Sequence, residues 1–404
     1  MKKLTILGDI MNEPPVHDQV KCAKGFDYTY TFKYLKELLK ASDYSVANLE
    51  TPLAGEAAVY THELVSFNAP DEIARAVKDT GIGLVTTANN HCFDRGLDGA
   101  YRTIDVLDSL GLKHTGTFKQ GKRKEAEYFT VGDATVAVIS YTYGTNSEIN
   151  HCVPDSKHNE CVNLLRDSVD KYLSQRVGPN PDAGKLKALK EAFAAAAGYE
   201  ASWEDVVALK RALRMWVGNT DDVYVREELD RALSRIEADY KKARENADIV
   251  IFYPHTGGQF NVKVGEFSRY FVKKAAEMGF DAVIAAHSHT TQEAEYLGGV
   301  PCFYSLGNVT MSPNSIYADK ACLPQYGLAA HFYIENKKIA KTTFTIFKII
   351  EDDTNPIAAE PVDMLYPALD SVGKEHLEAD VKAIYARVAK REITGDIIRS
   401  EYEL

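Results

Sequence analysis

The chain has 404 residues and a formal net charge of −11 at pH 7. This length fits one large α/β domain with an insertion better than one small domain, and 45% hydrophobic with 26% charged residues is typical of a globular protein in water. The acidic balance supplies no global basic field, which argues against a nucleic-acid partner.

Short apolar runs alternate with helical patterns along the first part of the chain. In chain order the pattern predicts a strand at 4–7, a helix at 32–41, a strand at 44–50, a helix at 71–80, a strand at 82–88, a helix at 97–110 and two β-rich runs at 128–132 and 135–143. This alternation favours a mostly parallel inner sheet with helices outside it.

The composition then changes to Ala-, Lys- and Glu-rich sequence, in which apolar residues from Val225 to Tyr240 repeat at helical spacing. We predict a helical insertion at 155–247 that serves as a lid or a subunit contact. It separates the first part of the α/β domain, 1–154, from its second part, 248–350.

The α/β pattern resumes with a strand at 248–255, a helix at 267–278 and strands near 281–289 and 302–309. The runs 327–335 and 338–350 flank a polar turn and predict an antiparallel hairpin. Residues 351–404 form a C-terminal extension with a polar helix near 376–391.

The sequence also carries signals of localisation. The apolar run 4–7 is too short for a secretory leader, and no stretch is long enough to span a membrane. The six cysteines are scattered, so we expect a cytoplasmic protein in a reducing compartment.

Polar clusters stand at the ends of five predicted strands. Their residues are Asp9; Asn48 and Glu50; Asn89, Asn90 and His91; His255; and His287 with His289. Ligands of α/β sheets gather beyond the carboxyl ends of the strands, and mixed Asp, Glu, Asn and His ligation suits Mn, Fe or Zn. Glu50 has two carboxylate oxygens and can bridge two ions. One such cluster alone is more often a turn or a cap, but alternation in "HSH" aims both imidazoles to one side, and five clusters in one chain favour a metal site.

These stretches carry a resemblance to a known family. The chain resembles the CapA family of capsule, or poly-γ-glutamate, biosynthesis proteins, a branch of the calcineurin-like metallophosphoesterase superfamily. The matching stretches, in the same order, are "GDIM", "NLETPL", "FNAPDEIARAVKDTGIGLVTTANNHCFDRG", "HTGGQF", "AHSH" and "SLGNV". They lie within residues 4–145 and 246–350, outside the predicted insertion and extension.

The resemblance implies a four-layer α/β/β/α sandwich that holds two divalent transition metal ions (Mn, Fe or Zn). By residue, it implies Asp9 and His289 as ligands of the first ion, Asn90, His255 and His287 as ligands of the second, and Glu50 as the bridge. It also implies that His91 protonates the leaving group, with Asp94 placed to orient the imidazole.

The sequence departs from the superfamily pattern near the first ligand. Met11 stands where many members have a histidine, and a thioether is a poor ligand for Mn or Fe, so we leave open whether one ion or two are bound. In "HTGGQF", Thr256 and Gln259 replace an aromatic and an acidic residue. Polar residues near the predicted site are candidate substrate contacts: His62, Asn68, Asn89, Tyr143 and Asn308.

The site predicts a metal-dependent hydrolase that acts on a small-molecule or polymeric anionic substrate. A metal-activated hydroxide would attack a phosphoester or an amide-type γ-glutamyl bond, with His91 as general acid. The alternative is a non-catalytic metal-binding component of a polymer-synthesis complex, whose partner, or a second copy of the chain, would contact the helical insertion. Members of the family are often membrane-associated.

Overall fold

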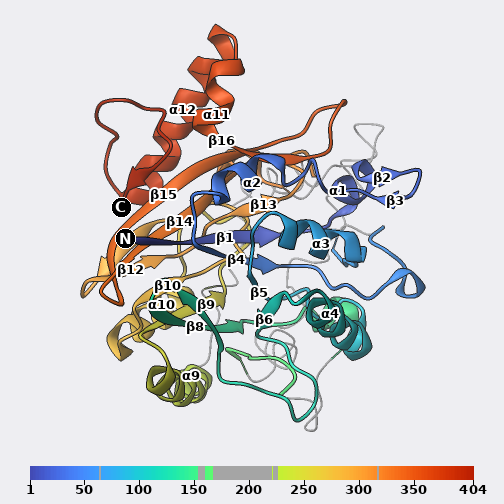
Figure 1. Ribbon diagram of the computed structural model, residues 1–404, viewed down its shortest axis with the longest axis vertical. Helices are drawn as coiled ribbons and strands as arrows, with labels where there is room; N and C mark the ends of the chain where they lie inside the picture. The colour runs from blue at the N-terminus through green and yellow to red at the C-terminus, as the bar shows by residue number, and fades with distance from the viewer. Residues whose placement is uncertain (63–64, 153–159, 167–220, 222–225, 316–317) are drawn as a thin grey trace, which may run out of the picture.

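The computed structural model describes residues 1–62, 65–152, 160–166, 221, 226–315 and 318–404. Within them, two large sheets pack face to face and helices cover the outer face of each (Figure 1). The layers run α/β/β/α, as the resemblance implied. The alternation of strands and helices had favoured one mostly parallel inner sheet, and that prediction is wrong because the strands divide between two mixed sheets.

The first sheet is built around the N-terminal strand β1 (Lys2–Ile10). Its order is β16-β15-β14-β1-β4-β5-β6, with β13 beside β1 and β17 beside β15. The bounds are β4 Tyr44–Leu49, β5 Leu84–Thr86, β6 Lys113–Thr115, β13 Asn308–Thr310, β14 Tyr326–Glu335, β15 Lys338–Ile350, β16 Ala358–Pro361 and β17 Tyr402–Glu403. The predicted β14–β15 hairpin is confirmed, and its two-residue turn has positive φ at Asn336 and Lys337, which suits the twist of paired strands.

The second sheet has the order β11-β12-β10-β9-β8-β7. The bounds are β7 Glu127–Val131, β8 Ala134–Thr142, β9 Ile249–His255, β10 Ala282–Ile284, β11 Ala294–Leu297 and β12 Val300–Phe303. Strands β8 and β9 pair in parallel from Val136–Ile249 to Thr142–His255. The long segment between them therefore leaves and rejoins the sheet at neighbouring strands.

Alternation along the strands divides the core into layers. Val136 and Val138 of β8 belong to the apolar cluster between the sheets, whereas Ala137 and Ile139 face the outer helices. The outer helices of the second sheet are α9 (Arg226–Asn246) and α10 (Glu266–Met278). Those of the first sheet are α2 (Lys33–Leu39), α3 (Asp71–Asp79) and α4 (Gly96–Leu110). Short helices and strands complete the fold: α1 Pro14–Gln19, β2 Lys21–Cys22, β3 Gly25–Phe26, α5 Ser147–Asn150 and α11 Val362–Leu365.

The C-terminal segment is part of this framework. Strands β16 and β17 extend the first sheet, and α12 (Ser371–Ala389) packs Leu377, Val381 and Ile384 into the cluster between the sheets. The two ends of the chain lie side by side, and Lys3 Nζ contacts Glu401 Oε1 at 2.5 Å (Figure 1). Burial of the apolar side of α12 ties the predicted extension to the rest of the domain.

The predicted insertion is described in part. Its last helix, α9, packs on β8 and β9, while the helices predicted within 167–220 lie outside the described residues. In the part of the chain that the structure describes, no helix combines the length and apolarity needed to cross a bilayer.

Candidate metal centre

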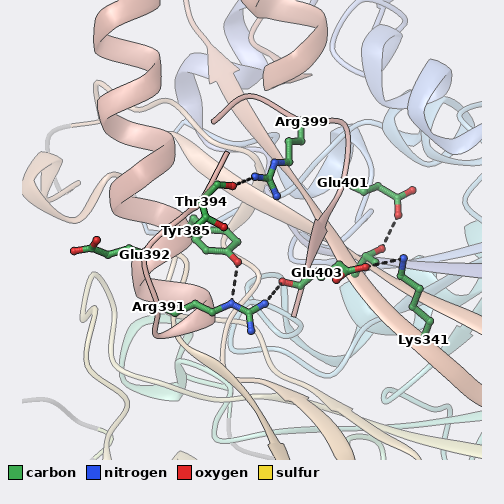
Figure 2. A pocket seen from close by; sticks show the side chains of 9 residues that line it. Lys341, Tyr385, Arg391, Glu392, Thr394, Arg399, Glu401 and Glu403 are labelled. Atoms are coloured by element: carbon green, nitrogen blue, oxygen red, sulfur yellow. Dashed lines mark hydrogen bonds and ion pairs between the residues drawn. The ribbon is translucent and has the colours of Figure 1, made fainter. Parts of the chain in front are cut away.

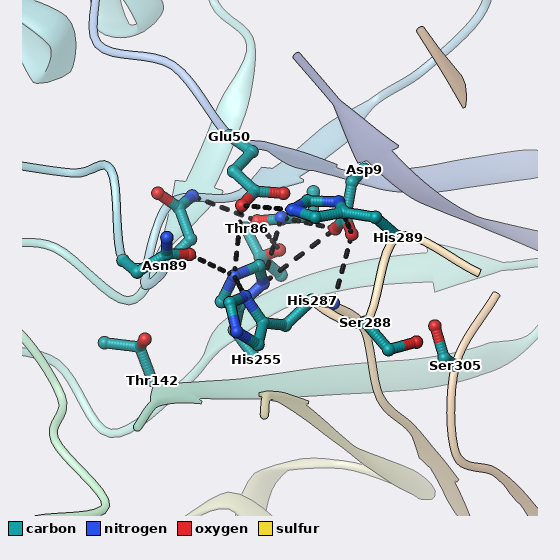
Figure 3. A network of polar contacts seen from close by, with 12 residues as sticks. Asp9, Glu50, Thr86, Asn89, Thr142, His255, His287, Ser288, His289 and Ser305 are labelled. Atoms are coloured by element: carbon teal, nitrogen blue, oxygen red, sulfur yellow. Dashed lines mark hydrogen bonds and ion pairs between the residues drawn. The ribbon is translucent and has the colours of Figure 1, made fainter. Parts of the chain in front are cut away.

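The predicted strand ends meet at one edge where the two sheets face each other. Asp9 on β1 is the neighbour of Asn48 on β4, which in turn lies beside Thr86 on β5. His255 ends β9 in the opposite sheet. The structure brings together the side chains of Asp9, Glu50, Asn90, His255, His287 and His289, and all six are buried. Figure 3 shows the two carboxylates and the three imidazoles of this set.

The carboxylates and imidazoles approach within reach of a shared cation. Glu50 Oε1 lies 3.3 Å from His255 Nε2 and 3.7 Å from His289 Nε2. Asp9 Oδ1 lies 3.8 Å from His255 Nδ1, and its Oδ2 lies 3.6 Å from His289 Nδ1. Two groups of three residues each place their ligand atoms within 4.8 Å of one another. One group is Asp9, Glu50 and His255, the other is Glu50, His287 and His289, and Glu50 belongs to both. This sharing suits a bridging role for Glu50, and the assignment of the other ligands to two ions stays a prediction.

Unsatisfied buried atoms indicate that the cluster suits a divalent cation. Both carboxylate oxygens of Glu50 and Nε2 of His289 are buried without a hydrogen-bond partner among the described residues. Buried polar atoms are normally paired, so these atoms point to an ion. Carboxylate, imidazole and amide donors together fit Mn, Fe or Zn.

Burial sets the protonation of these ligands. It raises the pKa of Glu50 to about 8, and burial together with the charge of Glu50 raises the pKa of Asp9 to about 8. Burial also lowers the pKa of His255 to about 4 and that of His289 to about 3, and it holds the pKa of His287 well below its usual range. At neutral pH the imidazoles are therefore uncharged, and each has a lone pair that can bind a cation. The two carboxyl groups carry protons that a cation would displace.

Asn48 links three residues around the cluster by hydrogen bonds, although the sequence pattern predicted no role for it beyond its place near Glu50. Its Nδ2 donates to Asp9 Oδ1 at 2.7 Å, and its Oδ1 accepts from Thr86 Oγ1 and Asn89 Nδ2, both at 3.1 Å. Outer contacts of this kind orient a ligand toward its ion. The signal that could have found it is its position two residues before Glu50 at the end of the same strand.

The "HSH" segment is a turn rather than a strand end. Strand β10 stops at Ile284, and both histidines have positive φ, 111° for His287 and 53° for His289. Both imidazoles do reach the same ligand group, as expected, but the turn directs them there and the predicted cause, strand alternation, is wrong. Such backbone costs on the order of 1–3 kcal/mol per residue and persists where contacts hold it. Here the His287 N–H donates to Asp9 Oδ2 at 3.0 Å.

His91 and Asp94 form a buried pair beside the ligands. His91 Nδ1 lies 2.6 Å from Asp94 Oδ2, and the ring of Phe67 stacks on the imidazole at 4.2 Å. Burial disfavours the charged imidazole, but Asp94 and then Glu50 and Asp9 outweigh it and raise the pKa of His91. Cys92 is buried in an apolar cluster and burial raises the pKa of its thiol, which suits a packing role.

The residues predicted to contact substrate divide by location. Tyr143 lies over the site, with its ring 4.5 Å from that of His287. Asn89 donates to the Leu49 carbonyl at 2.8 Å, and Asn308 Oδ1 lies 2.9 Å from His289 Nδ1, so both support other site residues. A contact of these three with substrate stays a prediction.

The two remaining candidates lie in the loop that follows β4. The Asn68 amide accepts from the Ala54 N–H and donates to the carbonyls of Gly55 and Val59. His62 is exposed, with Nδ1 3.0 Å from the Tyr60 carbonyl. The structure does not join either side chain to the ligand cluster, and their contact with substrate also stays a prediction.

Met11 lies away from the ligands. Its side chain is buried in the apolar cluster under the helices of the first sheet, and its backbone N–H donates to Thr310 Oγ1 at 2.9 Å. The histidine position of many superfamily members is thus an apolar core position in this chain.

A cavity of about 460 Å³ lies elsewhere, between β15 and the C-terminal segment (Figure 2). It is lined by Lys341, Thr343, Tyr385, Arg391, Glu392, Thr394, Arg399, Glu401 and Glu403. Its polar groups contact one another, as Lys341 does with Glu403 at 3.1 Å and Arg391 Nε with the Tyr385 hydroxyl at 3.0 Å. None of the predicted ligands lines it.

Known proteins resemble this chain over most of its length. An uncharacterized protein, y4sH, of Sinorhizobium fredii is 25% identical over 295 residues, which are 69% of this chain and 60% of that protein. "Capsule biosynthesis protein CapA" of Bacillus anthracis is 24% identical over 330 residues, 80% of this chain and 63% of that protein. "PGA biosynthesis protein CapA" of Bacillus subtilis is 21% identical over 327 residues, 80% of this chain and 67% of that protein. The chain thus spans about 60% of the length of the first of these relatives.

A solved structure of a hypothetical protein from Thermus thermophilus is 13% identical, with a TM-score of 0.42 over 86% of this chain and 99% of that one.

The family model described as "Bacterial capsule synthesis protein PGA_cap" matches residues 3–312, which include every predicted metal ligand. The chain therefore belongs to the bacterial capsule synthesis protein family PGA_cap, a metallophosphoesterase-like family.

Proposed function

We propose that the protein is a metal-dependent hydrolase that cleaves a phosphoester or a γ-glutamyl amide bond in capsule or poly-γ-glutamate metabolism. The observation that carries this proposal is the His91–Asp94 pair beside the buried ligands. A centre that only binds metal has no need of a buried imidazole whose Nδ1 lies 2.6 Å from a carboxylate oxygen of Asp94, which raises the pKa of the imidazole.

The ligand cluster would hold one or two divalent ions through Asp9, Glu50, Asn90, His255, His287 and His289. Such ions, when bound, supply Lewis acidity and lower the pKa of bound water. Asn48 and Asn308 orient Asp9 and His289 toward them by hydrogen bonds of 2.7 and 2.9 Å.

His91 serves as the general acid. The Asp94 carboxylate accepts a hydrogen bond from His91 Nδ1, which fixes the orientation of the imidazole. Nε2 is then the nitrogen that gives its proton to the leaving group. Phe67 covers one face of the ring and keeps water from it. The raised pKa of His91 favours the protonated form that an acid requires.

The chemistry of the site suits two kinds of electrophile. A γ-linked amide carbonyl and a phosphoryl group both develop negative charge on oxygen, and divalent cations stabilise either. The printed names of two relatives, which refer to capsule and PGA biosynthesis, support an anionic polymer or one of its fragments as the substrate.

The test uses the purified chain of 404 residues. Metal content is measured by mass spectrometry, and phosphoesters and γ-glutamyl peptides are then screened with and without Mn²⁺. Metal-dependent turnover that His91→Ala abolishes supports the proposal. Bound metal without turnover of either substrate class supports instead a non-catalytic component of a synthesis complex, and a protein that takes up no transition metal overturns both.

A further inference from the structure

Arg387 on helix α12 reaches the turn that carries two of the ligands. Its Nη1 donates to the Cys322 carbonyl at 2.8 Å, to Thr290 Oγ1 at 3.0 Å and to the Thr291 carbonyl at 3.2 Å. Thr290 directly follows His289 in the chain. Arg387 itself lies beyond residue 312, where the match to the family ends, so the family pattern assigns it no role.

Thr290 is the junction of these contacts. Its hydroxyl donates to the Cys322 carbonyl at 2.6 Å, and its own carbonyl accepts from Ser288 Oγ at 2.8 Å. The Cys322 carbonyl therefore receives hydrogen bonds from both Thr290 and Arg387. The side chain of Arg387 and the carbonyl of Cys322, which ends a short 3₁₀ helix (Lys320–Cys322), fix the same point of the turn.

The turn needs such support because its backbone is strained. His287 and His289 both have positive φ, which side-chain-bearing residues rarely adopt unless contacts hold them. Asn308 holds His289 from one side, at the ring nitrogen (2.9 Å) and at the backbone carbonyl (3.0 Å). Arg387 holds the two residues that follow, so the two side chains together fix residues 289–291 of the turn.

We infer, on the basis of the proposed metal-dependent function, that Arg387 is a positioning residue that holds the 287–291 turn in the conformation that presents His287 and His289 to divalent ions. Helix α12 is then part of the framework of the metal centre. Loss of an outer contact that orients a ligand typically weakens metal binding 10- to 100-fold.

The first test titrates Co²⁺ into the chain of 404 residues and its variants. Arg387→Met is expected to weaken Co²⁺ binding by about tenfold and to change the visible absorption of the bound ion. Arg391→Met is the matched control, because Arg391 lies two residues beyond α12, is exposed, and contacts Tyr385 and the Glu403 carbonyl instead of the turn. Co²⁺ affinity and spectrum equal in Arg387→Met and wild type overturn the inference.

The second test needs no metal. Amide hydrogen exchange of residues 286–292 is expected to be faster in metal-free Arg387→Met than in Arg391→Met, and equal exchange overturns the inference. Thr290→Val, which removes the shared hydroxyl, gives the same comparison if Arg387→Met does not fold. If the wild type takes up no Co²⁺ while exchange still rises, the proposed function fails and the role of Arg387 in holding the turn stands.

Discussion

Asp94 Oδ2 lies 2.6 Å from His91 Nδ1, and the same oxygen accepts the Phe67 backbone N–H at 2.7 Å. One carboxylate oxygen therefore fixes the imidazole and the loop whose aromatic ring stacks on it. The shared oxygen makes the acid, its orienting carboxylate and its covering ring one unit, and it directs Nε2 of His91 away from Asp94.

Replacing His91 by Gln tests the acid. The amide keeps a similar volume but cannot transfer a proton, so the rate on a substrate with a poor leaving group is expected to fall by about 10²–10⁴-fold. Metal content by mass spectrometry is expected to stay that of the wild type, since His91 is not among the ligands. A substrate with an activated leaving group is the control, because it needs no acid and should lose much less. Equal losses on the two substrates would contradict the assignment.

Glu50→Gln tests the bridge. The amide keeps the shape but removes the charge and an acceptor oxygen from the point that both ligand groups share. We expect the metal-to-protein ratio, measured by mass spectrometry after dialysis, to fall toward zero. Glu13→Gln is the control, because Glu13 is also a fully buried glutamate and its carboxylate accepts from Ser312 and Ser315 away from the ligands. A ratio unchanged in Glu50→Gln would show that Glu50 is no ligand.

Metal binding is expected to release protons in a manner that depends on pH. The pKa values of Asp9 and Glu50 are both about 8 in the metal-free protein, so each carboxyl carries a proton at pH 6 that a cation must displace. The three histidine ligands have lowered pKa values and contribute no protons. Calorimetry in buffers of different ionisation enthalpy should give close to two protons released at pH 6, where metal-bound water is still mostly un-ionised; at pH 9.5 both carboxyl groups are already ionised and only protons from metal-bound water remain. A release near zero at pH 6 would contradict the protonation of the pair.

His331 is expected to make the protein sensitive to acid. Its ring is buried between Thr5 and Thr345, with both ring nitrogens 2.9 Å from the threonine hydroxyls, and burial lowers its pKa to about 3. The unfolded chain binds this proton below its ordinary pKa of 6.5, so the free energy of unfolding falls as pH drops from 6.5 toward 3, by up to about 1.4 kcal/mol per pH unit. From pH 6.5 to 5, His331→Gln should lose about 1.6 kcal/mol less than the wild type in urea unfolding. If the free energy of unfolding changed with pH in the same way in His331→Gln and in the wild type, His331 would not be held neutral in the folded protein.

Much of the ligand cluster could be read from the sequence. Asp9, Glu50, His255 and the "HSH" segment each follow an apolar run, and parallel strands place their carboxyl ends at one edge. The helix that ends at Gly111 and the β14–β15 hairpin were equally predictable, since a left-handed cap and a two-residue turn are local signals.

Other features depend on contacts that a local pattern does not contain. Alternating strands and helices occur both in folds with one sheet and in folds with two, so the pattern does not tell them apart. The direct pairing of β8 with β9 joins residues more than a hundred positions apart in the chain. The position of Met11 in the outer core follows an irregularity in β1 pairing beside Asp9. The hydrogen bond from Arg387 to Thr290 joins residues 97 positions apart without any motif.

The most direct measurement is anomalous diffraction at the manganese edge from crystals of the protein grown with Mn²⁺. We predict a peak within bonding distance of a Glu50 carboxylate oxygen, with Asp9 and the three histidines among the other ligands. A second peak beside the same carboxylate would show two bridged ions. A crystal saturated with Mn²⁺ that shows no anomalous density between Glu50 and His287 would rule out a metal centre at this cluster.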